Sequence, residues 1–321
     1  MPQSPSDSPV GAPSGAAPTL VPVHQVDRVG FGTASGALVI PARYDDADGF
    51  TAGRAPVLAG EAWGYVDAAG ALVIPARFDS VTAFDGERAV VYRGGRGLII
   101  DLAGTVVATP EVDALHPLSE GLAPARQGEL WGYVDAGGAW VVAPRFDEAY
   151  AFSGGRARVG LAEGYGFVGR DGELAFPRTY DAAQDFSEGL AAVARDGRWG
   201  FVDPDGAAVI GLRYADARSF SDGVAAVEAE AGWGFVDRAG RVVVAPRFAR
   251  VGAMADGRAP VVVSETDGRW GYVDAAGTVV ISPRFTLALP FSGGLARVAT
   301  ETERGYIDRA GAWVFGPEPN G

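Results

Sequence analysis

Aromatic residues stand at fixed distances before a recurrent turn glycine along almost the whole chain. In the segment 63–78, WGYVDAAGALVIPARF, Trp63 lies seven positions before Gly70 and Tyr65 lies five positions before it. A separation of two places both rings on one face of an extended strand. The segment therefore predicts a β-hairpin, with strands at 63–67 and 71–74, a turn at 68–70, and Pro75 ending the regular pairing.

The hairpin recurs from one end of the chain to the other. A third strand precedes it, as at 88–92, and a tight turn at 93–96 joins the two. Each unit is thus predicted to be a three-stranded antiparallel meander of strands a, b and c, followed by a connector of about a dozen residues. The turn glycines, which are spaced by 34 residues except for one step of 37, are Gly36, Gly70, Gly104, Gly138, Gly172, Gly206, Gly240, Gly277 and Gly311. They define nine units.

A glycine between the two aromatic positions points to the opposite face of its strand. Because it has no side chain, a second backbone can approach it closely. The aromatic rings and this glycine predict the packing seam between units. The Trp-Gly pairs at these structural positions are Trp63 and Gly64, Trp131 and Gly132, Trp199 and Gly200, Trp233 and Gly234, and Trp270 and Gly271.

Nine such units can close into a ring or continue as an open superhelix. Propellers typically have 4–8 blades of four strands, so nine units of three strands favour an all-β, open or loosely coiled, solenoid-like array over a closed propeller. The array is expected to occupy residues 20–316 as one domain. A disordered Pro, Ser, Gly and Ala leader at 1–19 and a flexible tail at 317–321 are expected to flank it.

Composition narrows the possible partners. The net charge of −13 disfavours nucleic acid and anionic lipid, which are bound through clustered Lys and Arg. The chain has no Cys, no apolar run long enough to span a membrane, and no secretory signal pattern. We therefore expect a soluble cytoplasmic protein with no membrane insertion. The oligomeric state stays open.

Recurring polar residues offer candidate chemistry, but each has a structural interpretation. An Asp that opens the hairpin turn, as at Asp67, is typical of an Asx-turn rather than a cation site. The recurrent Arg of the connector, as at Arg77, is expected to bridge units by pairing with carboxylates. His24 and His116 lie in different units and do not suggest a triad or a metal site. The sequence predicts no catalytic, cofactor-binding or metal site.

The recurring pattern W-G-[YF]-V-D-x-x-G-x-x-V-[IV]-x-P-R-F, followed by F-S-x-G-[LR]-A, resembles the WG-repeat (KWG) family of bacterial proteins. The resemblance covers residues 20–315. It implies a repeat-built interaction module without an assigned activity, and it transfers no catalytic residue. The third unit departs most from the pattern, with Gly97 and Leu98 in place of Trp-Gly, and is interpreted as degenerate.

These observations favour a non-enzymatic binding or scaffold protein for an unidentified protein or other macromolecule. The alternatives are a carboxylate-based hydrolase or glycan-active enzyme, which needs one or two units with extra polar residues, and a self-assembling structural protein. The three extra residues of the eighth unit fall at 263–269, in the loop joining strands a and b. Insertions and binding contacts gather on such edges. The a–b edge, formed by these loops in all units, is therefore the predicted partner contact, through Glu265, Asp267 and Arg269 and the corresponding Glu129 and Arg198.

Overall fold

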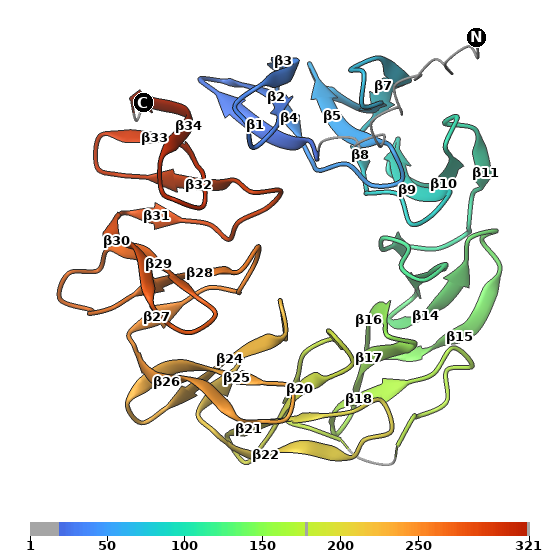
Figure 1. The fold of residues 1–321 in the computed structure, drawn as a ribbon. Helices are drawn as coiled ribbons and strands as arrows, with labels where there is room; N and C mark the ends of the chain where they lie inside the picture. Colours follow the sequence, from blue (N-terminus) through green and yellow to red (C-terminus); the bar gives the residue numbers. More distant parts are fainter. Residues whose placement is uncertain (1–18, 177–178, 320–321) are drawn as a thin grey trace, which may run out of the picture.

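The computed structural model describes residues 19–176 and 179–319, which form strands and turns and contain no helix. The strands make nine antiparallel sheets that follow one another around a ring (Figure 1). We number these sheets blades 1 to 9 in chain order. Within a blade, we call the strands first to fourth along the repeat.

The strands of each kind recur at matching positions in the blades. The first strands are β4 (Asp46–Ala47), β8 (Ser80–Val81), β12 (Ala114–Leu115), β16 (Glu148–Ser153), β19 (Ala182–Ala183), β23 (Asp216–Ala217), β27 (Arg250–Val251) and β31 (Leu287–Ala288). The second strands are β1 (Val21–Gln25), β5 (Ala55–Ala59), β9 (Arg88–Arg93), β13 (Leu122–Gln127), β17 (Arg156–Leu161), β20 (Ala191–Arg195), β24 (Val224–Ala229), β28 (Arg258–Val262) and β32 (Ala296–Ala299).

The third and fourth strands form the rest of each blade. The third strands are β2 (Arg28–Gly32), β6 (Ala62–Val66), β10 (Arg96–Asp101), β14 (Leu130–Asp135), β18 (Gly164–Val168), β21 (Arg198–Val202), β25 (Gly232–Asp237), β29 (Trp270–Asp274) and β33 (Glu303–Ile307). The fourth strands are β3 (Leu38–Tyr44), β7 (Leu72–Phe78), β11 (Val106–Ala108), β15 (Trp140–Phe146), β22 (Ala208–Tyr214), β26 (Val242–Phe248), β30 (Val279–Phe285) and β34 (Trp313–Pro319).

The connector between predicted units supplies an additional strand. In blade 2, Asp46 and Ala47 of β4 pair with Leu58 and Val57 of β5. The predicted strands a, b and c are therefore the second, third and fourth strands of a four-stranded blade. Figure 1 places fourth strands such as β15, β22 and β26 on the outer circumference, so the first strand, at the opposite edge of the sheet, is the inner one.

Aromatic rings fill the seams between blades, as the sequence predicts. The fully buried Tyr65 meets the edge of Phe84 in the next blade, with ring centroids 5.0 Å apart. Its hydroxyl donates to the carbonyl oxygen of Thr82, also in the next blade, at 2.8 Å. Equivalent ring pairs are Phe31 and Phe50, Tyr133 and Phe152, Phe167 and Phe186, Phe201 and Phe220, and Tyr272 and Phe291.

The ring is closed, so the expectation of an open, solenoid-like array is wrong. Val21 and Val23 of blade 1 share a buried cluster with Leu295, Tyr306 and Phe315 of blade 9. We call this contact the closing seam. The expectation assumed three strands per unit, whereas the short inner strand hidden in the connector makes most units four-stranded blades. The molecule is a nine-bladed β-propeller.

The recurrent glycine has a different structural role from the one predicted. A Cβ atom at Gly64 would lie 2.5 Å from the carbonyl oxygen of Ile74 and 2.7 Å from the amide nitrogen of Ala76. Both belong to the fourth strand of the same blade, where the register shifts around Pro75. The backbone does approach closely, but within a blade and not between units. The strand also continues past Pro75 to Phe78.

The described array extends beyond the predicted boundary at residue 316. β34 runs to Pro319, and its Glu318 and Pro319 pair with Arg304 and Glu303 of β33. The predicted leader lies outside the described residues except for Thr19. No helix in the described part of the chain could cross a membrane.

Candidate functional site

The recurrent Asp of the hairpin turn holds that turn together. In blade 2, Oδ1 of Asp67 accepts hydrogen bonds from the N–H groups of Ala69 at 3.0 Å and Ala71 at 2.9 Å. Backbone N–H groups also hold the pKa of Asp101 below its ordinary value, that of Thr105 contributing most. The same bonds recur at Asp135, Asp203, Asp237, Asp274 and Asp308. Among the residues the structure describes, no group of three or more acidic or His side chains is placed to hold a metal ion.

The recurrent Arg bridges units as expected, but mainly through a backbone carbonyl; only Arg145, among these Arg residues in the described ranges, also pairs with a carboxylate of the next blade, that of Glu173 at 3.1 Å. The guanidinium of Arg77 donates to the carbonyl oxygen of Gly104, the turn glycine of the next blade, at 2.8 Å. It also lies over the ring of Phe78, 5.2 Å from the centroid. The turn carbonyl is the acceptor because the tight hairpin turn projects it toward the preceding blade. The same bond is made by Arg43, Arg145, Arg213, Arg247 and Arg284.

A second set of bonds links the turns between first and second strands around the ring. Ser119 donates from its hydroxyl to the carbonyl oxygen of Phe152 at 2.7 Å. Glu120, next to it, accepts from the N–H of Gly155 at 3.1 Å. Both acceptor and donor lie in the following blade. Sequence reasoning missed this network, although the recurring F-S-x-G pattern was its signal.

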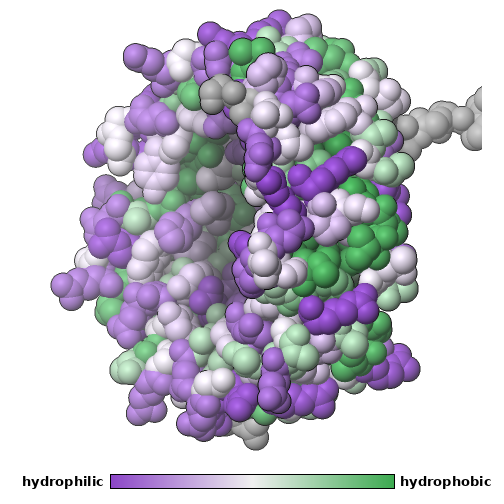
Figure 2. Space-filling model, turned by 90° about the vertical axis from the view of Figure 1, so that its left-hand side faces the viewer, coloured by the Kyte–Doolittle hydropathy of each residue, from purple (hydrophilic) through white to green (hydrophobic). Residues whose placement is uncertain are grey.

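The predicted a–b edge is formed by the turns between second and third strands. These turns have two residues between the strands in blades 1 to 7, three in blade 9 and seven, Val263 to Arg269, in blade 8. Glu265 pairs with Arg250 at 3.5 Å. Arg269 pairs with Glu301 in the turn of blade 9. Figure 2, which views the side of blades 8 and 9, shows hydrophilic residues over much of this side.

The structure brings only part of the predicted contact set together. Glu265, Asp267 and Arg269 share the long turn of blade 8. Glu129 lies in the two-residue turn of blade 4, and Arg198 begins β21 in blade 6. All five lie along the a–b edge, but the last two belong to other blades and extend no patch with the first three.

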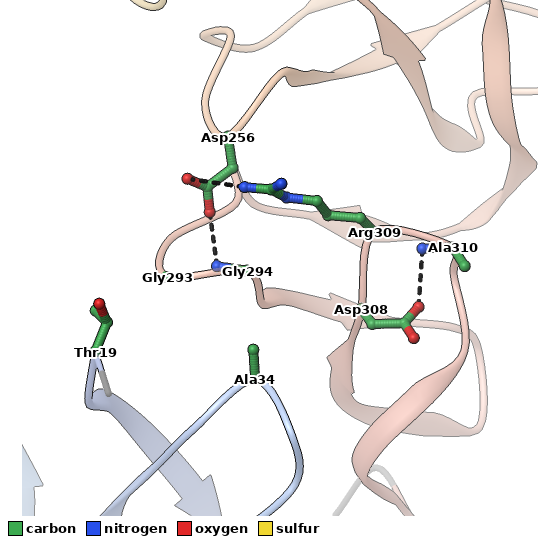
Figure 3. A pocket seen from close by; sticks show the side chains of 8 residues that line it. All are labelled: Thr19, Ala34, Asp256, Gly293, Gly294, Asp308, Arg309 and Ala310. Atoms are coloured by element: carbon green, nitrogen blue, oxygen red, sulfur yellow. Dashed lines mark hydrogen bonds and ion pairs between the residues drawn. The ribbon is translucent and has the colours of Figure 1, made fainter. Parts of the chain in front are cut away.

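The closing seam has an open depression beside the turns of blades 1, 8 and 9 (Figure 3). The volume of this depression is about 670 Å³. Asp256 accepts from the N–H of Gly294 at 2.7 Å and pairs with Arg309 at 3.5 Å. Asp308 accepts from the N–H of Ala310 at 2.9 Å. Both carboxylates are therefore already held by backbone N–H bonds of kinds that recur in other blades, as at Asp222 and Asp274.

The inner side of the closing seam contains a smaller cavity of about 250 Å³. Blade 1 has no first strand among its described residues, and this cavity lies along the free edge of β1. We call it the inner-strand notch. Its lining includes Pro22, His24, Asp48, Leu289, Arg297 and Tyr306.

The polar groups of the notch have unusual environments. Burial lowers the pKa of His24, and the positive charges of Arg297 and Arg304 lower it further, against a smaller opposing effect of Asp46. Burial raises the pKa of Tyr306, whose hydroxyl accepts from the N–H of His24 at 3.1 Å. The guanidinium of Arg297 makes no hydrogen bond or ion pair with any residue in the described ranges. The notch therefore presents a cation to its interior.

The chain is similar in fold to solved structures of other proteins. The chain matches a structure described as "Crystal structure of the eukaryotic initiation factor" with a TM-score of 0.65 and 11% identity, covering 93% of this chain and 96% of that one. The structure of Kluyveromyces lactis Hsv2p matches at 0.43 and 12%, covering 71% and 91%. That of the dihydro-heme d1 dehydrogenase NirN matches at 0.46 and 15%, covering 94% and 73%. At these identities the first likeness shows the fold alone. No curated protein matches this chain in sequence.

The molecule is thus a repeat-built β-propeller with bonded seams. The family model described as "WG containing repeat" matches residues 33–60, 63–96, 99–131, 131–161, 165–199, 199–230, 233–265 and 270–300. The chain belongs to the WG-repeat family, which confirms the resemblance seen in the sequence. Each matched repeat spans a seam from one blade to the next, so nine blades give eight such repeats and the closing seam is the ninth junction.

Proposed function

We propose that this propeller is a non-enzymatic binding protein that docks a protein or other macromolecular partner on the a–b edge of blades 8 and 9. The observation that carries the proposal is the seven-residue turn of blade 8, joined by the pair of Arg269 and Glu301 to the turn of blade 9. Two adjoining turns that depart from the common length offer a surface the other blades do not repeat. Changes at this edge leave the packed seams untouched.

The bonding of the recurring polar residues supports binding over catalysis. The Asp, Arg and Ser positions common to the blades hold turns and seams, as Asp67, Arg77 and Ser119 do. In the turn of blade 8, by contrast, the side chain of Glu265 remains 66% exposed despite its ion pair. Exposed charge of this kind gives specificity and faster association to a partner of complementary charge.

The test replaces Ser264 to Gly268 with a two-residue Asn-Gly turn. We expect a nearly unchanged melting temperature and reduced capture of partners from a lysate, measured by quantitative mass spectrometry. The matched control is Asp196→Asn in the two-residue turn of blade 6, which should retain capture. Unaltered capture by the shortened variant would remove this turn from the proposal.

A further inference from the structure

The second strands of blades 5 and 9 break a pattern at one equivalent position. Arg158 pairs in register with Phe167 of the third strand, and Arg297 pairs with Tyr306 in the same way. Other blades hold Pro, Val or Ala here, as at Pro56, Val90, Ala192 and Ala226. An Arg at this position therefore brings a charge to a site that is apolar in the other blades.

The charge of Arg158 has a partner from the next blade. Nε of Arg158 donates to Oδ1 of Asp185 in blade 6 at 2.9 Å. The following residue, Phe186, meets Phe167 edge to face at a centroid distance of 4.9 Å. An Asp-Phe dipeptide on the inner side of one blade thus fills a receptor made of Arg and an aromatic ring on the preceding blade.

Blade 9 presents the same receptor without that dipeptide among the described residues. Arg297 has no ion pair there, and Tyr306 stacks only on Phe315 of its own blade. Tyr65, Tyr133 and Tyr272 donate their hydroxyls to a carbonyl in or just after the first strand of the next blade, but the Tyr306 hydroxyl accepts from the N–H of His24 instead. The repeat spacing of 34 aligns Asp185 and Phe186 with Gly15 and Ala16, which carry neither a carboxylate nor a ring.

The edge of β1 offers free backbone groups to any segment that would place such a dipeptide in the notch. In blade 2, the N–H groups of Asp45 and Asp48 donate to the carbonyls of Leu58 and Pro56. The corresponding carbonyls in blade 1 are those of His24 and Pro22, and β1 has no neighbour on this side in the described sheet. Addition of an extended peptide to a free strand edge is a recurrent mode of recognition. A cavity of about 250 Å³ has room for a few side chains but is smaller than a typical drug-sized site.

We propose that the inner-strand notch binds an extended segment of a partner protein that carries an acidic residue followed by an aromatic one. The segment pairs with the free edge of β1, its carboxylate binds Arg297, and its ring packs against Tyr306. This site is separate from the a–b edge of blades 8 and 9 and does not depend on the function proposed for that edge.

The test uses a labelled synthetic peptide, YDAAQDFS, which copies residues 180–187 of blade 6. Titration of the full chain followed by fluorescence anisotropy should give saturable binding. Asn in place of the second Asp of the peptide, or Ala in place of its Phe, should weaken binding at least ~10-fold, equivalent to about 1.4 kcal/mol. Arg297→Ala should weaken it equally. Arg241→Ala, a control whose side chain is 81% exposed on blade 7, should not.

Further arms separate the possible occupants. The double variant Gly15→Asp with Ala16→Phe supplies the Asp-Phe dipeptide within the chain. It should compete with the peptide and weaken peptide binding at least ~10-fold, again about 1.4 kcal/mol. Removal of residues 1–18 should leave peptide affinity unchanged. A large gain on their removal would assign the notch to the chain's own leader, and a peptide that dissociates a dimer would assign it to a second copy. Either result, or binding indifferent to the Asp, the Phe and Arg297, would overturn the proposal.

Discussion

The seam between blades 5 and 6 and the closing seam between blades 9 and 1 carry the same pair of an Arg and an aromatic ring. At the first seam, the side chain of Arg158 is only 14% exposed, is paired with Asp185 and lies 3.4 Å from the ring centroid of Tyr150. At the second, Arg297 lines a cavity. The difference shows what completes such a seam. Arg158 and Phe167 of blade 5 are contacted by Asp185 and Phe186 of blade 6, whereas Arg297 and Tyr306 of blade 9 have no such dipeptide opposite them among the described residues.

Eight seams join blades that are consecutive in the chain, and the closing seam joins its two ends. The closing seam keeps the apolar part of the common design, with Val23 and Phe315 buried. It also has bonds of its own, such as that from the N–H of Val26 to Glu318 at 2.8 Å. Within the described residues, closure therefore rests on the apolar core and on these local bonds, and not on the inner-strand contacts of the other seams.

The largest effect expected from this comparison comes from removing the equivalent rings. Phe167→Ala should reduce the free energy of unfolding by about 3–5 kcal/mol, because a fully buried ring leaves a cavity. Tyr306→Ala should cost about 0.5–1.5 kcal/mol less, because Tyr306 has no edge-to-face partner across its seam among the described residues. Urea denaturation measures both. Equal losses would show that the two seams are packed alike.

The next effect separates the paired Arg from the unpaired one. Asp185→Ala should cost about 1–3 kcal/mol, since it leaves the mostly buried guanidinium of Arg158 without its carboxylate. Arg297→Leu should leave the free energy of unfolding unchanged or raise it, because Arg297 has no ion pair within the part of the chain that the structure describes. The control places Asp185→Ala in an Arg158→Leu background, where its cost should largely disappear. A destabilising Arg297→Leu would mean that Arg297 has a structural partner.

Much of the fold follows from the spacing of the turn glycines, which predicts nine units and an all-β array. Aromatic positions such as Tyr65 identify the seams because both rings lie on one face of a strand. Ring closure could not be predicted in this way. A two-residue inner strand such as Asp46–Ala47 is too short to show a periodicity of its own, and it is recognised only by its pairing with the second strand of the folded blade.

Of the two candidate sites, one could be predicted from the sequence and the other could not. The 37-residue step located the long turn of blade 8, because an insertion is visible in the sequence itself. The notch gave no such signal, since it depends on which residues meet when the ends of the chain come together. Arg297 and Arg158 could still have been identified as exceptions at a position that is otherwise Pro, Val or Ala. The partner of Gly64 was misassigned because the bulge at Pro75, which brings the fourth strand over the glycine, is a tertiary feature.

The smallest expected effect is the pH dependence of stability at the closing seam. The group responsible is His24, which stands in blade 1 at the position of Leu58 in blade 2. Burial and the charges of Arg297 and Arg304 lower the pKa of His24 in the folded protein, outweighing Asp46 on β4. The unfolded chain therefore takes up the proton first. The stability contributed by neutral His24 is complete above its unfolded pKa of about 6.5 and decreases as the pH falls below that value.

Thermal unfolding at pH 7.5 and 5.5 should accordingly show a lower melting temperature at pH 5.5, and His24→Leu should make this decrease smaller. Burial also lowers the pKa of His116, which stacks on Trp131 inside an ordinary blade. His116→Leu is therefore the matched control. If the closing seam is the more sensitive of the two because of its unpaired cation, His24→Leu will reduce the pH dependence more than His116→Leu does, and Arg297→Leu will reduce it in part. An equal response of both histidines would attribute the effect to burial alone.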